Sequence, residues 1–477
     1  MGMHFCRRSK GALVLGTIFC GWALFSTRSV AAVAPYPQSE VITDIAWDFS
    51  TVTTLREAVG SDLWPLTWAA DGNLYGAWGD GGGFQGADRV GRVSLGWARI
   101  SGFPMAANPP AIVGQNTWGL APEYAETAAT FGGKVFTEIS VGGVIYAYGG
   151  LWTRANTPDP VHRYASGPWS TLIWSADLDK TWQVASWTNY TLGTFLQFGK
   201  DYAGALDSYV YTYYHRTHDS NHLYLRRVQK NQLTADPGEV GVYQYLTGVD
   251  ARGTATGWST LEVNAGAVFF DPNGTDAEVV YDAPIGRFLL TSGHNPGAED
   301  ATMSAGQVGI FEAPHPWGPW ATVGYYDDWG NLGPESFGDY LGLHLPTKWM
   351  SADGQTLWAV FSSVGKYDAF HVVKATLRVN VGVPQLTAPP LDTALQPNAV
   401  VTARATAWPQ SWSLDWVNDT HSHIASGRGA SFTFKVPQGG VAGGLIRVTA
   451  IGSAGSVYHD YSIAAADAKT AITANSN

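Results

Sequence analysis

The sequence has very little cysteine: its two cysteines, Cys6 and Cys20, both lie within the first 32 of 477 residues. The remainder of the chain therefore has no thiol with which to form a disulfide bond, and its hydrophobic core must stabilise it. A chain of this length can bury a large core, and the length predicts two or three domains.

Long hydrophobic runs are also lacking, apart from one near the start of the chain. The apolar residues 11–25 follow the basic residues Arg7, Arg8 and Lys10 and precede the small residues 29–32. This order is typical of a signal peptide, and the apolar run is too short for a membrane span. We expect residues 1–32 to be a signal peptide, and the mature protein to be secreted or periplasmic.

Charged residues are scarce, at 14% of the chain, and acidic residues outnumber basic ones by 39 to 28. The formal net charge is −11, and it becomes −15 without the four basic residues of the leader. Such acidity argues against nucleic acid or an anionic membrane as a partner and favours a neutral or cationic ligand. No phosphate loop, dinucleotide fingerprint or nucleophile elbow is present, so we expect no cofactor.

Glycine and aromatic residues are abundant, with 56 Gly, 21 Trp and 22 Tyr. Long amphipathic helical patterns are absent, and short alternating or apolar runs bounded by turn residues recur instead. Together these features predict an all-β protein. The aromatic excess also suits a carbohydrate ligand, because an aromatic ring can pack on the apolar face of a sugar, although core packing explains most rings equally well.

Five strand-turn-strand units recur along the first 380 residues. Their reference positions, Tyr75, Ile145, Val210, Phe288 and Leu357, are separated by 70, 65, 78 and 69 residues. We interpret each unit as a turn followed by the inner strand of a sheet. The repeat predicts a five-bladed β-propeller over residues 41–380, because radial repetition protects the edges of so many strands.

Two further segments support this organisation. Residues 175–182 resemble the Asp box of sialidase-like propellers, Ser-x-Asp-x-Gly-x-Thr-Trp, with Asp179 in place of the glycine, which implies a structural hairpin.

After a proline-rich linker, alternating runs resume, and residues 384–465 predict a small immunoglobulin-like β-sandwich. We expect the final residues, 466–477, to be a disordered tail.

Two aspartates of the first unit are the leading candidates for catalysis. Acid–base chemistry on a glycosidic bond needs two carboxyl groups that face one pocket. Asp62 precedes one strand and Asp80 ends the next, and a hairpin brings such ends to the same side of a sheet. Without that chemistry, the same residues would be a turn cap and a loop acid. The neighbouring aromatic residues are candidate sugar-binding platforms: Trp64, Trp68, Trp78 and Phe84.

Other residues leave alternatives open. Asp201 is a candidate third carboxylate, and Glu138, in an apolar strand, would have its pKa raised by burial, as suits a general acid. A rival hypothesis is a polysaccharide lyase in which His215, with Tyr213 or Arg216, removes a proton beside a uronate. A third is a non-catalytic carbohydrate-binding propeller. The nearby histidines lack the spacing of a metal site, and we expect no metal.

Several segments also resemble a known family. Residues 62–84, 198–204, 207–211 and 286–290 are similar to a bacterial five-bladed propeller family, long a domain of unknown function, that includes endo-D-arabinanase glycoside hydrolases. The resemblance covers most of residues 45–379. It implies hydrolysis of a D-arabinan-like polysaccharide by carboxylates in positions similar to Asp62 and Asp80. The family hydrolases commonly have Gly-Asp-Thr-Phe, whereas here Gly79-Asp80 is followed by three glycines and Phe84, so the sugar itself is left open.

Overall fold

The computed structural model describes residues 33–464, apart from internal segments. The expected signal peptide, residues 1–32, and the expected disordered tail, residues 466–477, lie outside the described residues. The internal segments that it does not describe are 56–57, 88–89, 105–110, 119–131, 153–169, 189–192, 217–218, 251–252, 273–275, 294–305, 334–336, 338–339, 364–366, 381–385, 391–392, 406–408, 410, 418–421, 429–430, 439–443 and 453–454.

The described part of the chain is all-β. It contains strands and six short 3-10 helices, and no α-helix. The 3-10 helices are η2 (Gly83–Gln85), η4 (Lys200–Tyr202), η5 (Lys230–Gln232), η6 (Glu262–Asn264), η7 (Trp329–Asn331) and η8 (Thr347–Trp349). This confirms the all-β fold class predicted from composition.

Antiparallel strand groups follow one another along residues 42–379. The first group is β2 (Asp62–Trp68), β3 (Leu74–Gly79), β4 (Leu95–Gly102) and β5 (Ile112–Trp118); the second is β6 (Gly132–Val141), β7 (Val144–Trp152), β8 (Ser170–Ser175) and β9 (Gln183–Val184). The third is β10 (Gly193–Gln197), β11 (Tyr209–Arg216), β12 (Asp219–Gln229), β13 (Gln244–Leu246) and β14 (Trp258–Ser259), with β15 (Ala267–Phe270) beside β12.

The remaining groups complete this part of the chain. The fourth is β16 (Asp276–Asp282), β17 (Arg287–Gly293), β18 (Val308–Ala313) and β19 (Ala321–Tyr326). A short parallel pairing of β10 with β16 joins it to the third group. The fifth is β20 (Tyr340–His344), β21 (Thr356–Ser363), β22 (Tyr367–Val379) and β1 (Ile42–Leu55). Because β1 is the outer strand of the last group, the start of the chain is tied to the end of this region.

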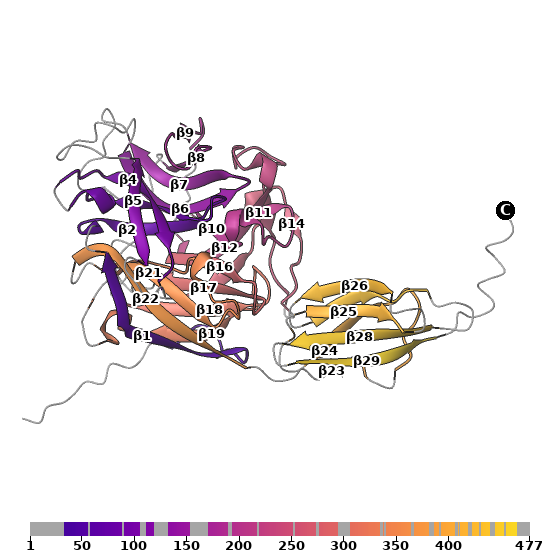
Figure 1. Cartoon of the computed structure of the whole chain (residues 1–477). Helices are drawn as coiled ribbons and strands as arrows, with labels where there is room; N and C mark the ends of the chain where they lie inside the picture. The colour runs from indigo at the N-terminus through magenta and orange to yellow at the C-terminus, as the bar shows by residue number, and fades with distance from the viewer. Residues whose placement is uncertain are drawn as a thin grey trace, which may run out of the picture.

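The first strands of the groups form a closed ring. Strand β2 contacts β6, β6 contacts β10, β10 contacts β16, β16 contacts β20, and β20 contacts β2 again. Figure 1 shows these sheets gathered in one body, with the later strands set to one side. The ring places residues of distant segments around one central space.

The sequence repeat correctly located the five strand groups, but the strand that it identified as the innermost of each group is the second one. Tyr75, Ile145, Val210, Phe288 and Leu357 lie in β3, β7, β11, β17 and β21, each of which is the second strand of its group. The innermost strand precedes the turn in every case. The misassignment has a physical cause: the second strands are covered on both faces by neighbouring sheets, so they have the longest apolar runs. All six residues of β3 are buried, as are six of the seven residues of β17 and seven of the eight residues of β21.

The Asp-box-like segment forms the turn between β8 and β9, as its resemblance implied. Asp177 accepts hydrogen bonds from the Thr181 backbone N–H at 2.9 Å and from the Thr181 hydroxyl at 2.7 Å. The Ser175 hydroxyl donates to the same carboxylate at 2.8 Å. Asp179 adopts φ = 64°, the left-handed conformation that explains why glycine is usual at this position.

Residues 386–463 form two further sheets around a separate core. One contains β23 (Leu386–Ala388), β24 (Val400–Ala405) and β27 (Ser431–Lys435); the other contains β25 (Ser411–Trp416), β26 (His423–Arg428), β28 (Gly444–Gly452) and β29 (Gly455–Ile463). Residues of both sheets share one hydrophobic cluster that includes Trp412, Phe432 and Val448. The two sheets therefore enclose a hydrophobic core of their own.

Candidate active site

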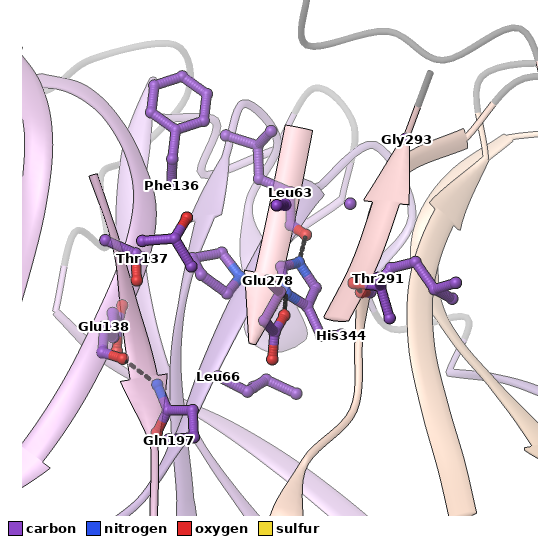
Figure 2. A pocket seen from close by; sticks show the side chains of 15 residues that line it. Leu63, Leu66, Phe136, Thr137, Glu138, Gln197, Glu278, Thr291, Gly293 and His344 are labelled. Carbon is purple, nitrogen blue, oxygen red and sulfur yellow. Dashed lines mark hydrogen bonds and ion pairs between the residues drawn. The ribbon is translucent and has the colours of Figure 1, made fainter. Parts of the chain in front are cut away.

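A pocket lies inside the ring of innermost strands. Its empty volume is about 710 Å³, including the space at its open mouth, and every innermost strand contributes to its wall. Figure 2 shows the side chains that line it. The apolar residues are Leu63, Pro65, Leu66, Phe136, Ala277 and Leu343, and the polar ones are Thr137, Glu138, Thr194, Gln197, Glu278, Thr291 and His344. An apolar wall with a few convergent polar groups is typical of a small-ligand site.

Asp62 and Asp80 do not line this pocket themselves but lie together at the end of the β2–β3 hairpin that contributes to its wall. Asp62 directly precedes the pocket residue Leu63 and pairs across the hairpin with Gly79, the neighbour of Asp80. A Cβ atom on Gly79 would lie 2.5 Å from Asp62 Oδ1, so the Asp62 carboxyl group occupies the space that glycine leaves. Asp62 and Asp80 are therefore close together, as the hairpin predicted, and Gly79 leaves room for the Asp62 carboxyl group.

The two carboxyl groups have contrasting surroundings. Burial raises the pKa of Asp62 to about 8, and the nearby charges of Asp80 and Asp368 act in the same direction against the attraction of Lys134. Asp62 Oδ1 is buried and has no hydrogen-bond partner among the described residues. At neutral pH Asp62 therefore carries a proton, as a general acid must.

Asp80 is bound by two cations instead. Lys134 Nζ contacts Asp80 Oδ1 at 2.7 Å, and an Arg92 guanidinium nitrogen contacts Oδ2 at 3.1 Å. The Lys134 side chain is only 8% exposed, whereas that of Asp80 is 30% exposed. These pairs neutralise a carboxylate on Asp80 and leave it open to solvent. A protonated carboxyl group next to an ionised one is the arrangement that acid–base catalysis requires.

The glycine run after Asp80 is packed against the protein itself. Ser61 Oγ accepts a hydrogen bond from the Gly83 N–H at 2.9 Å, and Asn116 Nδ2 donates to the Gly82 carbonyl at 2.8 Å. Cβ atoms on Gly81, Gly82 and Gly83 would each lie within 2.4 Å of other atoms. The close approach expected of these glycines is therefore to the backbone and side chains of the chain, and it fixes the loop that carries Asp80.

A His–Glu pair in the pocket wall was missed by sequence reasoning. His344 Nδ1 contacts the Glu278 carboxyl group, and His344 Nε2 lies 2.8 Å from the Leu63 carbonyl oxygen (Figure 2). The signal in the sequence was a single polar residue within an apolar strand, Leu341-Gly-Leu-His344-Leu345. Lys134 was missed as well, and it does not stand out in the same way, because β6 also contains the polar residues Thr137, Glu138 and Ser140.

The structure places the other two candidate acids away from Asp62 and Asp80. The Glu138 side chain is 1% exposed and lies beside Trp97, Ala77 and Asp179, between the first and second strand groups. Its backbone carbonyl reaches the pocket wall, where it accepts a hydrogen bond from Gln197 Nε2 at 2.5 Å. Burial raises the pKa of Glu138 well above its usual value, as expected, and repulsion by Asp179 adds to it.

Asp201 has a structural contact instead. Its carboxylate accepts hydrogen bonds from the Ser140 hydroxyl at 2.7 Å and from the Gly143 N–H at 2.9 Å. Ser140 is six residues after Lys134 on β6, a distance of about 20 Å along a strand. Asp201 therefore fastens the turn at the far end of β6, away from Asp62 and Asp80, and its role as a third carboxylate beside them is corrected.

Most of the predicted sugar platforms are core residues. Trp64 and Trp78 are fully buried, and Phe84 is 7% exposed and packs against Trp64 with ring centroids 5.0 Å apart. A ring without an exposed face cannot stack on a sugar, so these three predictions are corrected. Trp68 is partly exposed but ends β2, six residues from Asp62 and about 20 Å away along the strand.

The residues of the rival lyase hypothesis make structural contacts within and around the β11–β12 hairpin. Tyr213 is fully buried and donates its hydroxyl hydrogen to the Pro316 carbonyl at 2.5 Å. His215 Nδ1 lies 2.8 Å from the His222 carbonyl oxygen and 3.2 Å from that of Asp219, in the hairpin of β11 and β12. A fully buried Tyr213 has no exposed hydroxyl with which to meet a substrate.

The described ranges show neither a metal centre nor a membrane helix. Among them, no group of three or more His, Cys, Asp or Glu side chains is placed to hold a metal ion. No helix found there has the length and apolar character needed to cross a membrane. The expectations that the protein uses no metal and no cofactor stay predictions.

Comparisons with known proteins give distant structural likeness. No family model matches the chain, and no curated protein matches it. A provisionally named hydrolase from Bacteroides ovatus is similar with a TM-score of 0.45 and 10% identity over 68% of this chain and 90% of that one. An arabinanase from Bacillus subtilis has a TM-score of 0.33 and 11% identity over 67% and 95% of the two chains.

A family 117 glycoside hydrolase from Zobellia galactanivorans is similar with a TM-score of 0.35 and 8% identity, over 70% of this chain and 90% of that one. At such low identities and TM-scores, the function of this chain has to be inferred from its own residues.

Proposed function

We propose that this protein is a glycoside hydrolase in which Asp62 is the general acid and Asp80 is the base or nucleophile. One observation carries the proposal: the partly buried carboxyl group of Asp62, whose pKa burial raises to about 8, lies beside the ion-paired, solvent-accessible carboxyl group of Asp80, and Leu63, the neighbour of Asp62, lines a pocket. In this scheme Asp62 protonates the glycosidic oxygen as the bond breaks, while Asp80 activates water or attacks the anomeric carbon.

The substrate of the proposal is a neutral polysaccharide. Among the described pocket residues the one basic side chain, His344, is already paired with Glu278, so the wall offers no unpaired positive charge to a uronate. Apart from the carboxyl groups of Glu138 and Glu278, the other polar lining side chains carry hydroxyl or amide groups, which suit sugar hydroxyls; Thr194 and Gln197 are examples. The family resemblance favours a D-arabinan-like furanoside within this class.

The proposed domain organisation follows from the strand groups. We propose that the five groups of residues 41–380 are the blades of a five-bladed catalytic propeller, and that residues 384–465 are an immunoglobulin-like sandwich. The closed ring of innermost strands supports the first assignment, and the separate two-sheet core supports the second. Residues 1–32 are proposed as a signal peptide, which makes the mature protein secreted or periplasmic.

Hydrolysis in ¹⁸O-labelled water tests the reaction class directly. Incubation with arabinan, arabinogalactan and a uronate polymer is expected to release oligosaccharides from a neutral polymer, each with one ¹⁸O atom at its new reducing end. A lyase would instead form an unsaturated sugar that absorbs ultraviolet light and contains no ¹⁸O. Unsaturated products, or binding without cleavage of any polymer by the secreted protein, would contradict the proposal.

Replacement of Lys134 by methionine tests the electrostatics of the pair. Lys134 lowers the pKa of Asp62, so its loss is expected to raise that pKa further and to move the alkaline limb of the pH–rate profile to higher pH. Loss of the 2.7 Å contact with Asp80 is also expected to lower kcat by at least about tenfold. Arg99→Met is the control, because Arg99 contacts Gln115 on the same strand group. An unshifted alkaline limb in Lys134→Met would exclude this role.

A further inference from the structure

Strand β2 begins with a strained bulge directly after Asp62. Leu63 and Trp64 have φ values of 72° and 58°, in the left-handed region that non-glycine residues rarely adopt. The pairing with β3 shifts between Leu63 and Leu66, which marks a bulge. Bulges next to active sites re-aim neighbouring side chains, and here the adjacent side chain is that of Asp62. Something must hold this backbone in its unfavourable conformation.

A contact from the last strand group holds the strained bulge of β2 in place. The Leu63 carbonyl oxygen lies 2.8 Å from His344 Nε2, across the junction between β2 and β20. Strand β20 has its own register shift at Gly342, whose φ is 67°. A Cβ atom at Gly342 would lie 2.5 Å from His344 Nε2 and 3.0 Å from the Leu63 carbonyl oxygen. Glycine at position 342 is therefore needed for this contact to form.

Glu278 sets the orientation of the imidazole ring. A carbonyl oxygen can only accept a hydrogen bond, so His344 Nε2 must carry the hydrogen that it donates to Leu63. His344 Nδ1 then faces the Glu278 carboxyl group, with which it shares a further proton or forms an ion pair. Both side chains are largely buried, at 10% and 15% exposure, so the ring is fixed on both sides (Figure 2).

We propose that His344, oriented by Glu278, is a positioning residue that locks the strained β2 bulge and thereby aims Asp62 at Asp80. The inference rests on the proposed function, in which these two aspartates act. In this proposal, the contact between β2 and β20, which closes the ring of innermost strands, serves catalysis as well as folding. Misplacement of a catalytic group by about 1 Å costs on the order of 100-fold in rate, so this role has a measurable size.

The test compares His344→Leu, His344→Gln and Glu278→Ala with the wild-type protein on the most rapidly cleaved polysaccharide. His344→Leu is expected to lower kcat by about 10- to 100-fold with KM changed by less than about twofold. His344→Gln places an amide N–H near the position of Nε2, so it is expected to recover most of the lost kcat. Because the pair acts as a unit, the double variant His344→Leu/Glu278→Ala is expected to lose no more than His344→Leu alone.

A structural measurement separates positioning from general destabilisation. In a crystal structure of His344→Leu, Leu63 and Trp64 are expected to relax to negative φ, with the Asp62 carboxyl group displaced. His423→Leu is the matched control, because His423 also pairs with a carboxylate, Asp415, but lies in the C-terminal sheets. Its kcat is expected to equal that of the wild type.

Each remaining outcome overturns the inference. A raised KM with unchanged kcat would make His344 a substrate contact, and a lowered melting temperature with unchanged kcat would make it purely structural. The same series includes Asp62→Asn, so the two proposals can fail separately. Full activity of Asp62→Asn would end the proposed function, whereas loss of activity in Asp62→Asn with an unaffected His344→Leu would end only the positioning role.

Discussion

Replacement of Asp62 by asparagine is expected to lower kcat on a polysaccharide by about 10²- to 10⁴-fold, the usual contribution of a general acid. The same substitution is expected to raise the free energy of unfolding at pH 7. The two effects have one cause: the site holds a carboxyl group in surroundings that disfavour its charge. Asparagine fills similar space without an ionisable proton, so it removes the catalytic proton and the cost of burying an acid together.

The sign of the stability effect follows from proton linkage. The pKa of Asp62 is about 8 in the folded protein and about 4 in an unfolded chain. Between these values the folded state retains a proton that the unfolded state releases, so the free energy of unfolding falls as pH rises. Asp62→Asn removes this fall in the free energy of unfolding, which amounts to at most about 4 kcal/mol at pH 7. Urea denaturation at pH 5, 7 and 9 measures it.

Asp80→Asn is the matched comparison. It is expected to lose a similar part of kcat but to gain no stability, because Asp80 is partly exposed and paired with Lys134 and Arg92. Aryl glycosides with an acidic leaving group separate the roles, since departure of that group needs no proton. On such a substrate Asp62→Asn is expected to recover much of its activity and Asp80→Asn none. Equal recovery by both variants would contradict the assignment of acid and base.

Local sequence patterns were sufficient to predict the Asp62–Asp80 pair. Both residues belong to one hairpin, and antiparallel pairing alone brings the start of β2 to the end of β3. The same patterns did not predict which aromatic rings face solvent. Trp64 and Trp78 lie in strands covered on both faces, where the alternation that distinguishes a buried from an exposed side chain disappears.

The residues that complete the site come from other strand groups. Lys134 is the third residue of β6, and His344, which lies 281 residues after Leu63, ends β20. Closure of the ring brings them to β2, and closure is a property of the whole fold. Spacing along the chain therefore carries no information about these contacts. A lone polar residue in an apolar strand marks such a position but does not identify its partner.

A second large effect is expected from the buried carboxyl groups of Glu138 and Asp179. Both side chains are almost fully buried, and burial raises the pKa of each well above its usual value. Their mutual repulsion adds to the effect of burial on Glu138. The folded protein therefore retains protons that an unfolded chain releases near pH 4. The free energy of unfolding is expected to fall as pH rises above about 4, by up to about 1.4 kcal/mol per pH unit for each group.

The double variant Glu138→Gln/Asp179→Asn is expected to flatten this decline and to be more stable than the wild type at pH 7 and above. Asparagine tolerates the left-handed backbone at position 179, so the hairpin of β8 and β9 is preserved. Glu239→Gln, at an exposed position, is the control and should leave the slope unchanged. Urea denaturation between pH 4 and 9 gives the slope directly. A double variant with the wild-type slope would mean that Glu138 and Asp179 ionise in the folded protein, and that the layer between the first two strand groups admits enough water to solvate them.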